Sequence, residues 1–225
     1  MTRIAYTNAL AELRQGILDL GVLVQKRLTQ GLAALVSHDA ATSVLVQEGD
    51  EDIDRRTFAI KHIYIDLLTL QQPVAGDIRA ITGAYRICAD LERIGDLAVN
   101  LADYTGDSET LSMVSPSRIE EVGRISIEML AGAMRAYADG NVVLATAVIR
   151  RDDELDAVTW NTIKAFLEAL HQAGRTAWDD STARRHAEEA VPVLLSMRDL
   201  ERSGDHAVNI ARRVVYIVTG EESRI

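Results

Sequence analysis

Cysteine, proline and aromatic residues are scarce in this chain, and each scarcity excludes a class of protein. The 225 residues include one Cys, 3 Pro and only 4% aromatic residues. A lone cysteine, Cys88, cannot form an intrachain disulfide, which excludes a disulfide scaffold and fits the reducing cytoplasm. Strands favour aromatic and β-branched residues, so the composition disfavours β-sheets. We therefore expect an all-α fold.

Basic charge and long apolar runs are lacking as well. The formal net charge is −10, whereas proteins that bind nucleic acid usually carry a basic stripe. No run of apolar residues is long enough for a transmembrane helix, and no basic-then-apolar leader opens the sequence. We expect a cytoplasmic protein that does not bind nucleic acid and associates with membranes at most peripherally.

Apolar residues recur every three or four positions along most of the chain, which is the signature of amphipathic helices. Hydrophobic residues make up 48% of the sequence, enough to bury a sizeable core. The pattern predicts six long helices, with Pro73 ending the second because proline cannot continue a helix. Their approximate ranges are 3–36, 44–72, 76–104, 118–138, 142–172 and 182–218.

An eleven-residue string occurs twice and indicates an internal repeat. "DLERIGDLAVN" covers residues 90–100 and "DLERSGDHAVN" covers residues 199–209, with nine positions identical. Each copy lies on the third of three predicted helices, so one structural unit is used twice. We predict two antiparallel three-helix bundles related by pseudo-twofold symmetry, each with its own core. The bundles would cover residues 1–106 and 117–225, joined by a linker at 107–116.

Carboxylates four residues apart are the chemical feature of the repeat. Side chains at this spacing lie one turn apart on the same helix face, where like charges repel by about 0.2–0.5 kcal/mol. A second acidic pair stands near the start of the middle helix of each half, in "GDEDID" and "RDDELD". The candidate residues are Asp50, Asp54, Glu92 and Asp96 in the first half, and Asp152, Asp156, Glu201 and Asp205 in the second.

In antiparallel packing the start of the middle helix lies near the end of the third helix, so four carboxylates could converge in each half. Cations such as Mg²⁺, Mn²⁺, Fe³⁺ or Zn²⁺ accept carboxylate oxygens and would turn this repulsion into coordination. We therefore predict two oxygen-rich metal sites. The alternative is that the acids belong to solvated helix faces and pair with the repeated Arg93 and Arg202.

The strings "LERIGD", "LERSGD", "LQQPVAGDIR" and "EGDEDID" resemble those of the PhoU family, and the resemblance covers essentially the whole chain. It implies metal ions or clusters held by the motif acids Glu92, Asp96, Glu201 and Asp205, with Asp50 and Asp152 matching acids at the start of the middle helices. Asp54 and Asp156 are assigned to the ligand set only by their spacing of four residues from Asp50 and Asp152. The second half has no counterpart of "QQPVAGD", so the two halves need not bind the same ion.

The resemblance also implies a role. Proteins of this family accompany the phosphate ABC transporter, report its status to a sensor histidine kinase, and keep the phosphate-starvation response off while phosphate is plentiful. They are frequently homodimers. On this basis we expect a negative regulator of high-affinity phosphate uptake that is an adaptor and has no enzymatic activity.

Two other functions are compatible with parts of the sequence. A carboxylate-bridged di-metal redox protein needs Glu-x-x-His pairs on facing helices, whereas His62, His171 and His186 lie away from the repeated string. A helical interaction module without metal would use the acids only for charge complementarity with its partners. The chain shows neither a phosphate-cradling glycine loop nor a cofactor fingerprint, which agrees with a non-catalytic role.

Overall fold

The computed structural model describes residues 3–69, 75–105, 113–175 and 178–221, and every regular element in these ranges is an α-helix, as the composition predicts. The helices of the first half are α1 (Arg3–Ser37), α2 (Ala40–Glu48), α3 (Asp50–Thr69) and α4 (Ala75–Asp103). Those of the second half are α5 (Pro116–Asp139), α6 (Val142–Arg150), α7 (Asp152–Gly174) and α8 (Asp180–Thr219). Pro73 and most of the predicted linker 107–116 lie outside the described residues.

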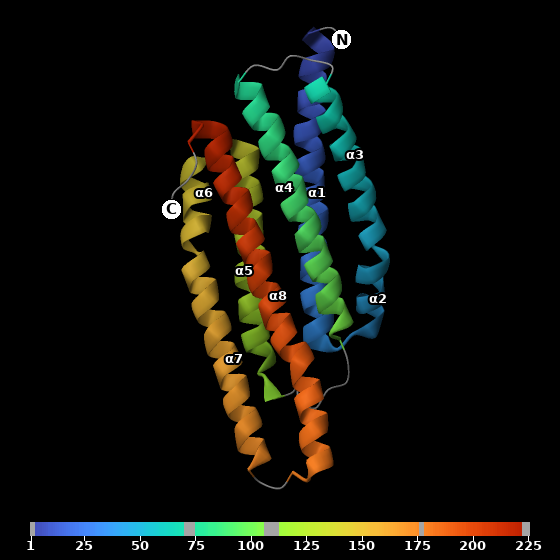
Figure 1. Cartoon of the computed structure of the whole chain (residues 1–225), viewed down its shortest axis with the longest axis vertical. Coiled ribbons are helices and arrows are strands. Elements are labelled where there is room, and N and C mark those ends of the chain that lie inside the picture. Colours follow the sequence, from blue (N-terminus) through green and yellow to red (C-terminus); the bar gives the residue numbers. More distant parts are fainter. Residues whose placement is uncertain (1–2, 70–74, 106–112, 176–177, 222–225) are drawn as a thin grey trace.

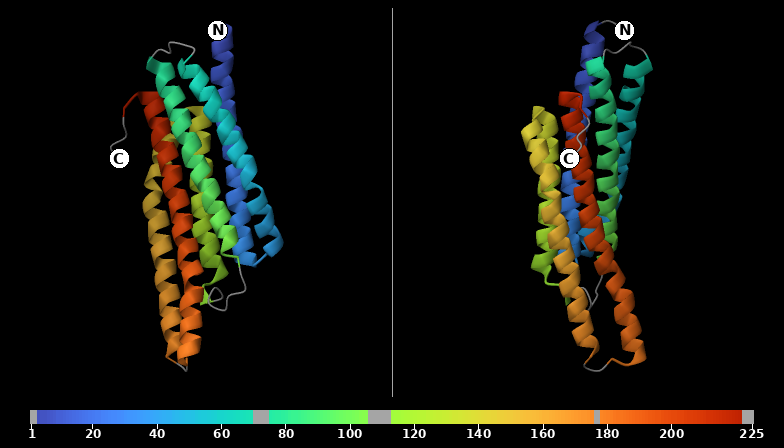
Figure 2. Two further views of the ribbon diagram at one scale, coloured as in Figure 1. Left: turned by 45° about the vertical axis from the view of Figure 1, so that its right-hand side comes forward. Right: turned by 60° about the vertical axis from the view of Figure 1, so that its left-hand side comes forward.

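The long helices α1, α4, α5 and α8 form the centre of the molecule (Figure 1). Within each half, α1 packs along α4 and α5 packs along α8, while α4 against α8 and α1 against α5 join the halves. The shorter helices α2 and α3 flank one side of this centre, and α6 and α7 flank the other (Figures 1 and 2). Both views show the C-terminal part of α7 and the first turns of α8 projecting beyond the other helices.

The expectation that each bundle has a core of its own is wrong. One continuous cluster of buried apolar side chains includes Leu20 and Leu28 of α1, Leu91 of α4, Ile125 of α5 and Leu200 of α8. The cause is that α4 and α8 bury residues over a wide arc, which lets each helix contact its own half and the other half together. The hydrophobic period of a sequence shows which face is apolar but does not show which helix covers it.

The middle helix of each half is divided in two, which differs from the single helix that the pattern predicts. The breaks fall at Gly49 and Arg151, which are equivalent positions of the repeat, and their φ, ψ values are −78°, −6° and −78°, −9°. At ψ near 0° the backbone tightens into a turn with a hydrogen bond between residues three apart, as between the Gly49 amide and the Val46 carbonyl. The next helix then continues along the same side of the bundle. As a result, Asp50 and Asp152 become the first residues of new helices.

The helix starts before these breaks are also matched between the halves. His38 and Gly140 both adopt positive φ, at 54° and 61°, and each is followed by a capping residue. Asp39 Oδ1 accepts a hydrogen bond from the Ala41 amide at 2.9 Å, and Asn141 Oδ1 accepts one from the Leu144 amide at 3.0 Å. Side-chain oxygens of this kind satisfy amides that the first turn of a helix leaves free. The repeat therefore extends well beyond the eleven-residue string.

Candidate functional site

Each half brings its four predicted acids into electrostatic contact. We call Asp50, Asp54, Glu92 and Asp96 acid cluster I, and Asp152, Asp156, Glu201 and Asp205 acid cluster II. The first two acids of each cluster lie at the start of α3 or α7, and the other two lie in α4 or α8. Helix N-termini carry a partial positive charge, which favours carboxylates there.

Burial and mutual repulsion act on both clusters. In cluster I, burial and then the charges of Asp54, Asp96 and Glu92 raise the pKa of the Asp50 carboxyl. In cluster II, burial is again the largest cause, followed by the charge of Asp156. Together they raise the pKa values of the carboxyls of Asp152, Glu201 and Asp205.

Glycines allow the helices that carry the acids to lie close together. A Cβ atom added to Gly95 of α4 would lie 2.9 Å from Ile53 Cδ1 of α3, which is closer than real Cβ contacts. A Cβ atom on Gly204 of α8 would collide with the buried side chain of Leu155 of α7. The glycine of each repeated string thus sets the distance between the two acid-bearing helices.

The two clusters differ in the cations that surround them. In cluster I, Lys61 Nζ lies 3.0 Å from Glu92 Oε2, and Arg93 Nη1 lies 3.1 Å from Asp96 Oδ2. The repeat places Ile163 where cluster I has Lys61, so cluster II has no lysine at this point. In cluster II, His206, Arg202 and Arg212 act to lower the pKa of the Asp205 carboxyl, but burial and the charge of Asp156 outweigh them. Lys61 is a neighbour that the sequence pattern did not single out.

The side chains as they stand do not form a closed ligand set. Among the described residues, no three His, Cys, Asp or Glu groups meet at one point that could hold a metal ion. The chemistry of cluster II nevertheless fits a cation, because Asp152 Oδ1 is buried without a hydrogen-bond partner in this part of the chain. Hard and borderline cations bind carboxylate oxygens, and one here would satisfy this atom and offset the repulsion among the acids.

A second use of the repeated string lies between the halves. Asp90 and Asp199, the first residues of the two copies, each contact the other half. Fully buried Asp199 accepts hydrogen bonds from Asn100 Nδ2 of α4 and from the OH of Tyr104, which follows α4, both at 3.1 Å. Asp90 Oδ1 lies 2.9 Å from His206 Nδ1 of α8. The sequence could have indicated a structural role for Asp90 and Asp199, since both are among the nine identical positions of the repeated string.

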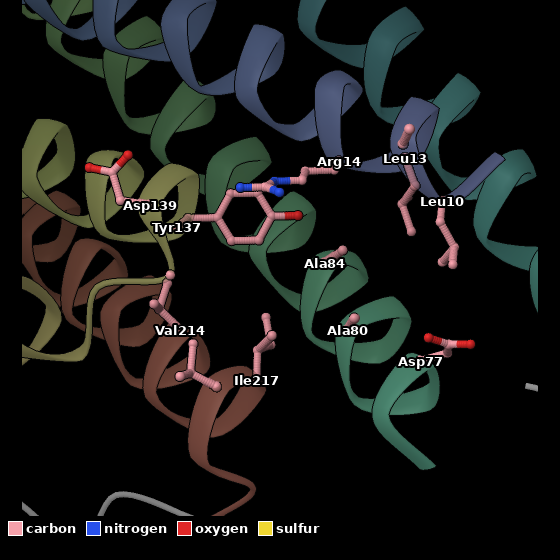
Figure 3. Close-up of a pocket in the computed structure, with 13 residues that line it drawn as sticks. Leu10, Leu13, Arg14, Asp77, Ala80, Ala84, Tyr137, Asp139, Val214 and Ile217 are labelled. Carbon is pink, nitrogen blue, oxygen red and sulfur yellow. The ribbon is translucent and has the colours of Figure 1, made fainter. Parts of the chain in front are cut away.

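A hollow between the long helices lies away from both clusters (Figure 3). It has a volume of about 500 Å³ and lies where α1, α4, α8 and the end of α5 meet. Figure 3 shows the ring of Tyr137 beside Arg14, and the Arg14 guanidinium donates to the Ala138 carbonyl. Burial raises the pKa of Tyr137 to about 12. Most of the lining is aliphatic, namely Leu10, Ala11, Leu13, Ala80, Ala84, Val214, Ile217 and Val218.

One pair of residues bears on the di-metal redox alternative. Glu168 and His171 form a Glu-x-x-His pair, but it lies on the exposed face of α7, several turns beyond the acids of cluster II. Among the described residues, no helix combines the length and the hydrophobicity needed to span a lipid bilayer.

Known proteins are similar to this chain over nearly all of its length. A 28% identical protein of Rhizobium meliloti (strain 1021) and a 30% identical protein of Pseudomonas putida are both named phosphate-specific transport system accessory protein PhoU homolog. Each matches 97% of this chain, over 89% and 82% of their own lengths. The crystal structure of PhoU from Pseudomonas aeruginosa superposes with a TM-score of 0.83 at 27% identity, covering 96% of this chain and all of that one.

A second crystal structure gives the same result. The phosphate transport system regulatory protein PhoU from Streptococcus pneumoniae has a TM-score of 0.80 at 25% identity, over 98% of this chain and all of that one. The family model described as "PhoU domain" matches twice, at residues 17–105 and 119–214, one match in each half. The chain therefore belongs to the PhoU domain family.

Proposed function

We propose that this chain is a metal-binding regulatory adaptor of phosphate homeostasis. The observation that carries the proposal is the pair of acid clusters, built at equivalent positions of the two halves from a helix start and a neighbouring long helix. The relatives that match along the whole chain are named as accessory proteins of the phosphate-specific transport system. A cation that fixes the two acid-bearing helices would organise a surface for partner proteins.

The regulatory part of the proposal follows the family resemblance. The chain would act in the cytoplasm as a homodimer, binding the phosphate ABC transporter and a sensor histidine kinase. While phosphate is plentiful, these contacts would keep the phosphate-starvation response off and limit high-affinity uptake. The adaptor works by binding and not by catalysis.

Cluster II is the stronger candidate for the metal. Asp152, Asp156, Glu201 and Asp205 would hold the ion, and the buried Oδ1 atom of Asp152 would gain a partner. Oxygen ligands fit Mg²⁺, Mn²⁺, iron or Zn²⁺, so the donor set narrows the metal to hard and borderline cations. Asp50, Asp54, Glu92 and Asp96 would form the equivalent site in the first half.

Elemental analysis of the untagged protein tests the metal. We expect stoichiometric metal in the wild type and a loss in the double variant Glu201→Ala, Asp205→Ala. The matched control is Glu120→Ala, Glu121→Ala, which removes two exposed carboxylates of α5. Equal metal content in all three proteins would show that the acids of cluster II are surface charges and not metal ligands.

A helical interaction module without metal is the second candidate, and the ion pairs of cluster I favour it for the first half. Lys61 and Arg93 already neutralise part of the charge of Glu92 and Asp96. If cluster I binds no metal, the double variant Glu92→Ala, Asp96→Ala will retain the wild-type metal content. A loss of metal in this variant would establish a second metal site instead.

Deletion of the gene tests the regulatory role separately. We expect phosphate-responsive transcription to rise in phosphate-rich medium and to return to its repressed level when the wild-type gene is restored. Complementation with Glu201→Ala, Asp205→Ala then shows whether cluster II is needed. Unchanged transcription in the deletion strain would contradict the regulatory proposal without bearing on metal binding.

A further inference from the structure

The hollow of Figure 3 lies between the two halves of the chain. Its walls come from α1 and α4 of the first half and from α5 and α8 of the second. Figure 3 shows Ala80, Ala84, Val214 and Ile217 around its open middle. The volume of about 500 Å³ lies within the range of small-molecule pockets, which is about 300–1,000 Å³. The hollow is therefore large enough for a small organic molecule.

Two alanines of α4 leave this space open. Ala80 and Ala84 are equivalent in the repeat to Glu189 and Val193 of α8. Val193 is 1% exposed and belongs to the core. The repeat thus has larger side chains at both equivalent positions and does not itself require a hollow between α4 and its neighbours.

One hydroxyl group at the hollow lacks a partner. The OH of Tyr137 forms no hydrogen bond with another described residue. Figure 3 shows this hydroxyl directed from the ring toward the side of the hollow where Ala84 lies. Burial raises the pKa of Tyr137 to about 12, so the phenol is neutral near pH 7 and can donate its proton to an acceptor. Buried polar groups are normally hydrogen-bonded, and a ligand oxygen would satisfy this one.

The charged residues of the lining lie toward its edges. The Arg14 guanidinium donates to the carbonyl of Ala138, and the next residue, Asp139, carries the opposite charge; both charged side chains are exposed. Asp77 accepts a hydrogen bond from Tyr6 OH at 3.0 Å. A charged ligand would meet charges of both signs at the edges and would lose its hydration against the aliphatic middle. This arrangement favours an uncharged ligand.

The length of the hollow limits the size of the ligand. Its wall on α4 extends from Asp77 to Ala84, which is about 10 Å along a helix at a rise of 1.5 Å per residue. An extended chain of atoms advances about 1.2 Å per bond, one third of the length of an extended residue. About eight bonds therefore span the hollow.

We propose that this hollow binds an uncharged aliphatic molecule of about eight carbons whose single oxygen accepts a hydrogen bond from Tyr137 OH. Medium-chain alcohols, ketones and esters have this chemistry. Because helices of both halves line the hollow, the ligand would contact both halves and stabilise their association. The inference goes beyond the proposed function and depends neither on metal binding nor on the regulatory role.

Methyl NMR of the full-length chain with 1-octanol tests the site. We expect the methyl signals of Val214 and Ile217 to shift with a dissociation constant of about 0.1 mM, as is reasonable for nine non-hydrogen atoms. The signals of Ile163 and Leu167, which line a shallow apolar groove on α7, should stay in place. An absence of shifts at Val214 and Ile217 up to about 2 mM overturns the proposal, and so do equal shifts in both places.

Ligands of different length and charge test the chemical class. From 1-hexanol to 1-octanol the affinity should rise about fourfold with each methylene, because each added group is buried. Octanoate and octylammonium should bind at least tenfold more weakly than 1-octanol. Tighter binding of octanoate would show that Arg14 selects an anion, and tighter binding of octylammonium would show that the carboxylates select a cation. Either result contradicts an uncharged ligand.

Two substitutions test the contacts within the hollow. Ala80→Phe fills the space and should abolish binding, whereas Ala89→Phe, a matched change at an exposed position of α4, should leave it unchanged. Tyr137→Phe should weaken 1-octanol about threefold to tenfold through the lost hydrogen bond. The gain per methylene should persist in Tyr137→Phe, because the aliphatic wall is intact. Wild-type affinity in both Ala80→Phe and Tyr137→Phe, with native helix content by circular dichroism, would place the ligand elsewhere.

A ligand of this class is either a free molecule or the acyl chain of a membrane lipid. Flotation with phosphatidylcholine vesicles separates the two, and we expect the wild type to remain unbound to vesicles. Flotation that is lost in Ala80→Phe would assign the hollow to a lipid chain and overturn a free ligand. Repeating the titration in EDTA with Glu201→Ala, Asp205→Ala keeps this test apart from that of the metal, since 1-octanol should bind this variant with wild-type affinity.

Discussion

At the scale of single residues, the most constrained polar group is Asp199, because it is fully buried and satisfies donors from the other half. Replacing it with Ala would leave Asn100 and Tyr104 without their acceptor. Fully buried donors without partners cost about 1–3 kcal/mol, and these two donors are half-buried. We therefore expect Asp199→Ala to lower the free energy of unfolding by about 1 kcal/mol, the low end of this range, measured by urea denaturation.

The equivalent substitution Asp90→Ala is the control for this prediction. Asp90 and its partner His206 have side chains that are 15% and 18% exposed, so water can replace part of the lost contact. We expect a smaller loss of stability than for Asp199→Ala. An equal or larger loss would mean that the crossed contacts of the two halves are energetically equivalent.

The acids of cluster II predict how stability depends on pH. Burial and repulsion raise the pKa values of Asp152, Glu201 and Asp205 in the folded state. Between the unfolded and the raised folded pKa values the native state binds more protons, so stability falls as pH rises through the folded values. Through this contribution of cluster II, metal-free protein should melt at a higher temperature near pH 5 than at pH 7.5.

Thermal melts in EDTA at both pH values check this contribution. The double variant Glu201→Gln, Asp205→Asn removes two of the titrating charges, so its melting temperature should change less between the two pH values than that of the wild type. Added metal should reverse the trend, because cations bind deprotonated carboxylates and compete with protons. A variant with the same pH dependence as the wild type would show that cluster II does not titrate in this range.

At the scale of helices, Gly204 controls how closely α8 approaches α7. A methyl group at this position would collide with Leu155, which is fully buried and cannot move into solvent. Overpacking of this kind costs about 1–3 kcal/mol and shifts the helices apart. We expect Gly204→Ala to destabilise the chain, and to reduce metal content if the metal joins these helices.

Gly95→Ala provides the comparison in the first half. The new methyl group would meet the end of the Ile53 side chain at 2.9 Å, which is a milder contact than at Gly204. Differential scanning calorimetry should show a smaller fall in melting temperature than for Gly204→Ala. If Gly95→Ala proved the more damaging change, the spacing of α3 and α4 would be the more rigid one.

Helix positions were predictable from the sequence to a greater extent than helix breaks. The apolar period of α1 and α5 follows directly from the order of residues, and the repeat revealed that the acids occur in two matched sets. The bends at Gly49 and Arg151 were not predictable, since both residues keep right-handed φ and ψ values and the apolar pattern continues across them. Lys61 was missed because it lies outside the repeated string and lacks a counterpart.

At the scale of the whole molecule, the single core determines how the chain unfolds. Apolar residues of α4 pack against α8, and Asp90 and Asp199 cross the same boundary. Neither half can separate without exposing this shared surface to water, which is unfavourable in proportion to the apolar area. We therefore expect the two matches to the family model to describe a sequence repeat and not two independently stable domains.

We expect the full-length chain to unfold in one cooperative transition. Calorimetry should give a van't Hoff enthalpy equal to the calorimetric enthalpy, which is the test of two-state unfolding. Because both halves share the core, the destabilising change Asp199→Ala should lower this one transition and leave it undivided. Two separate transitions, of which only the one belonging to the second half moves in Asp199→Ala, would show that each bundle is stable by itself, as the sequence repeat alone suggests.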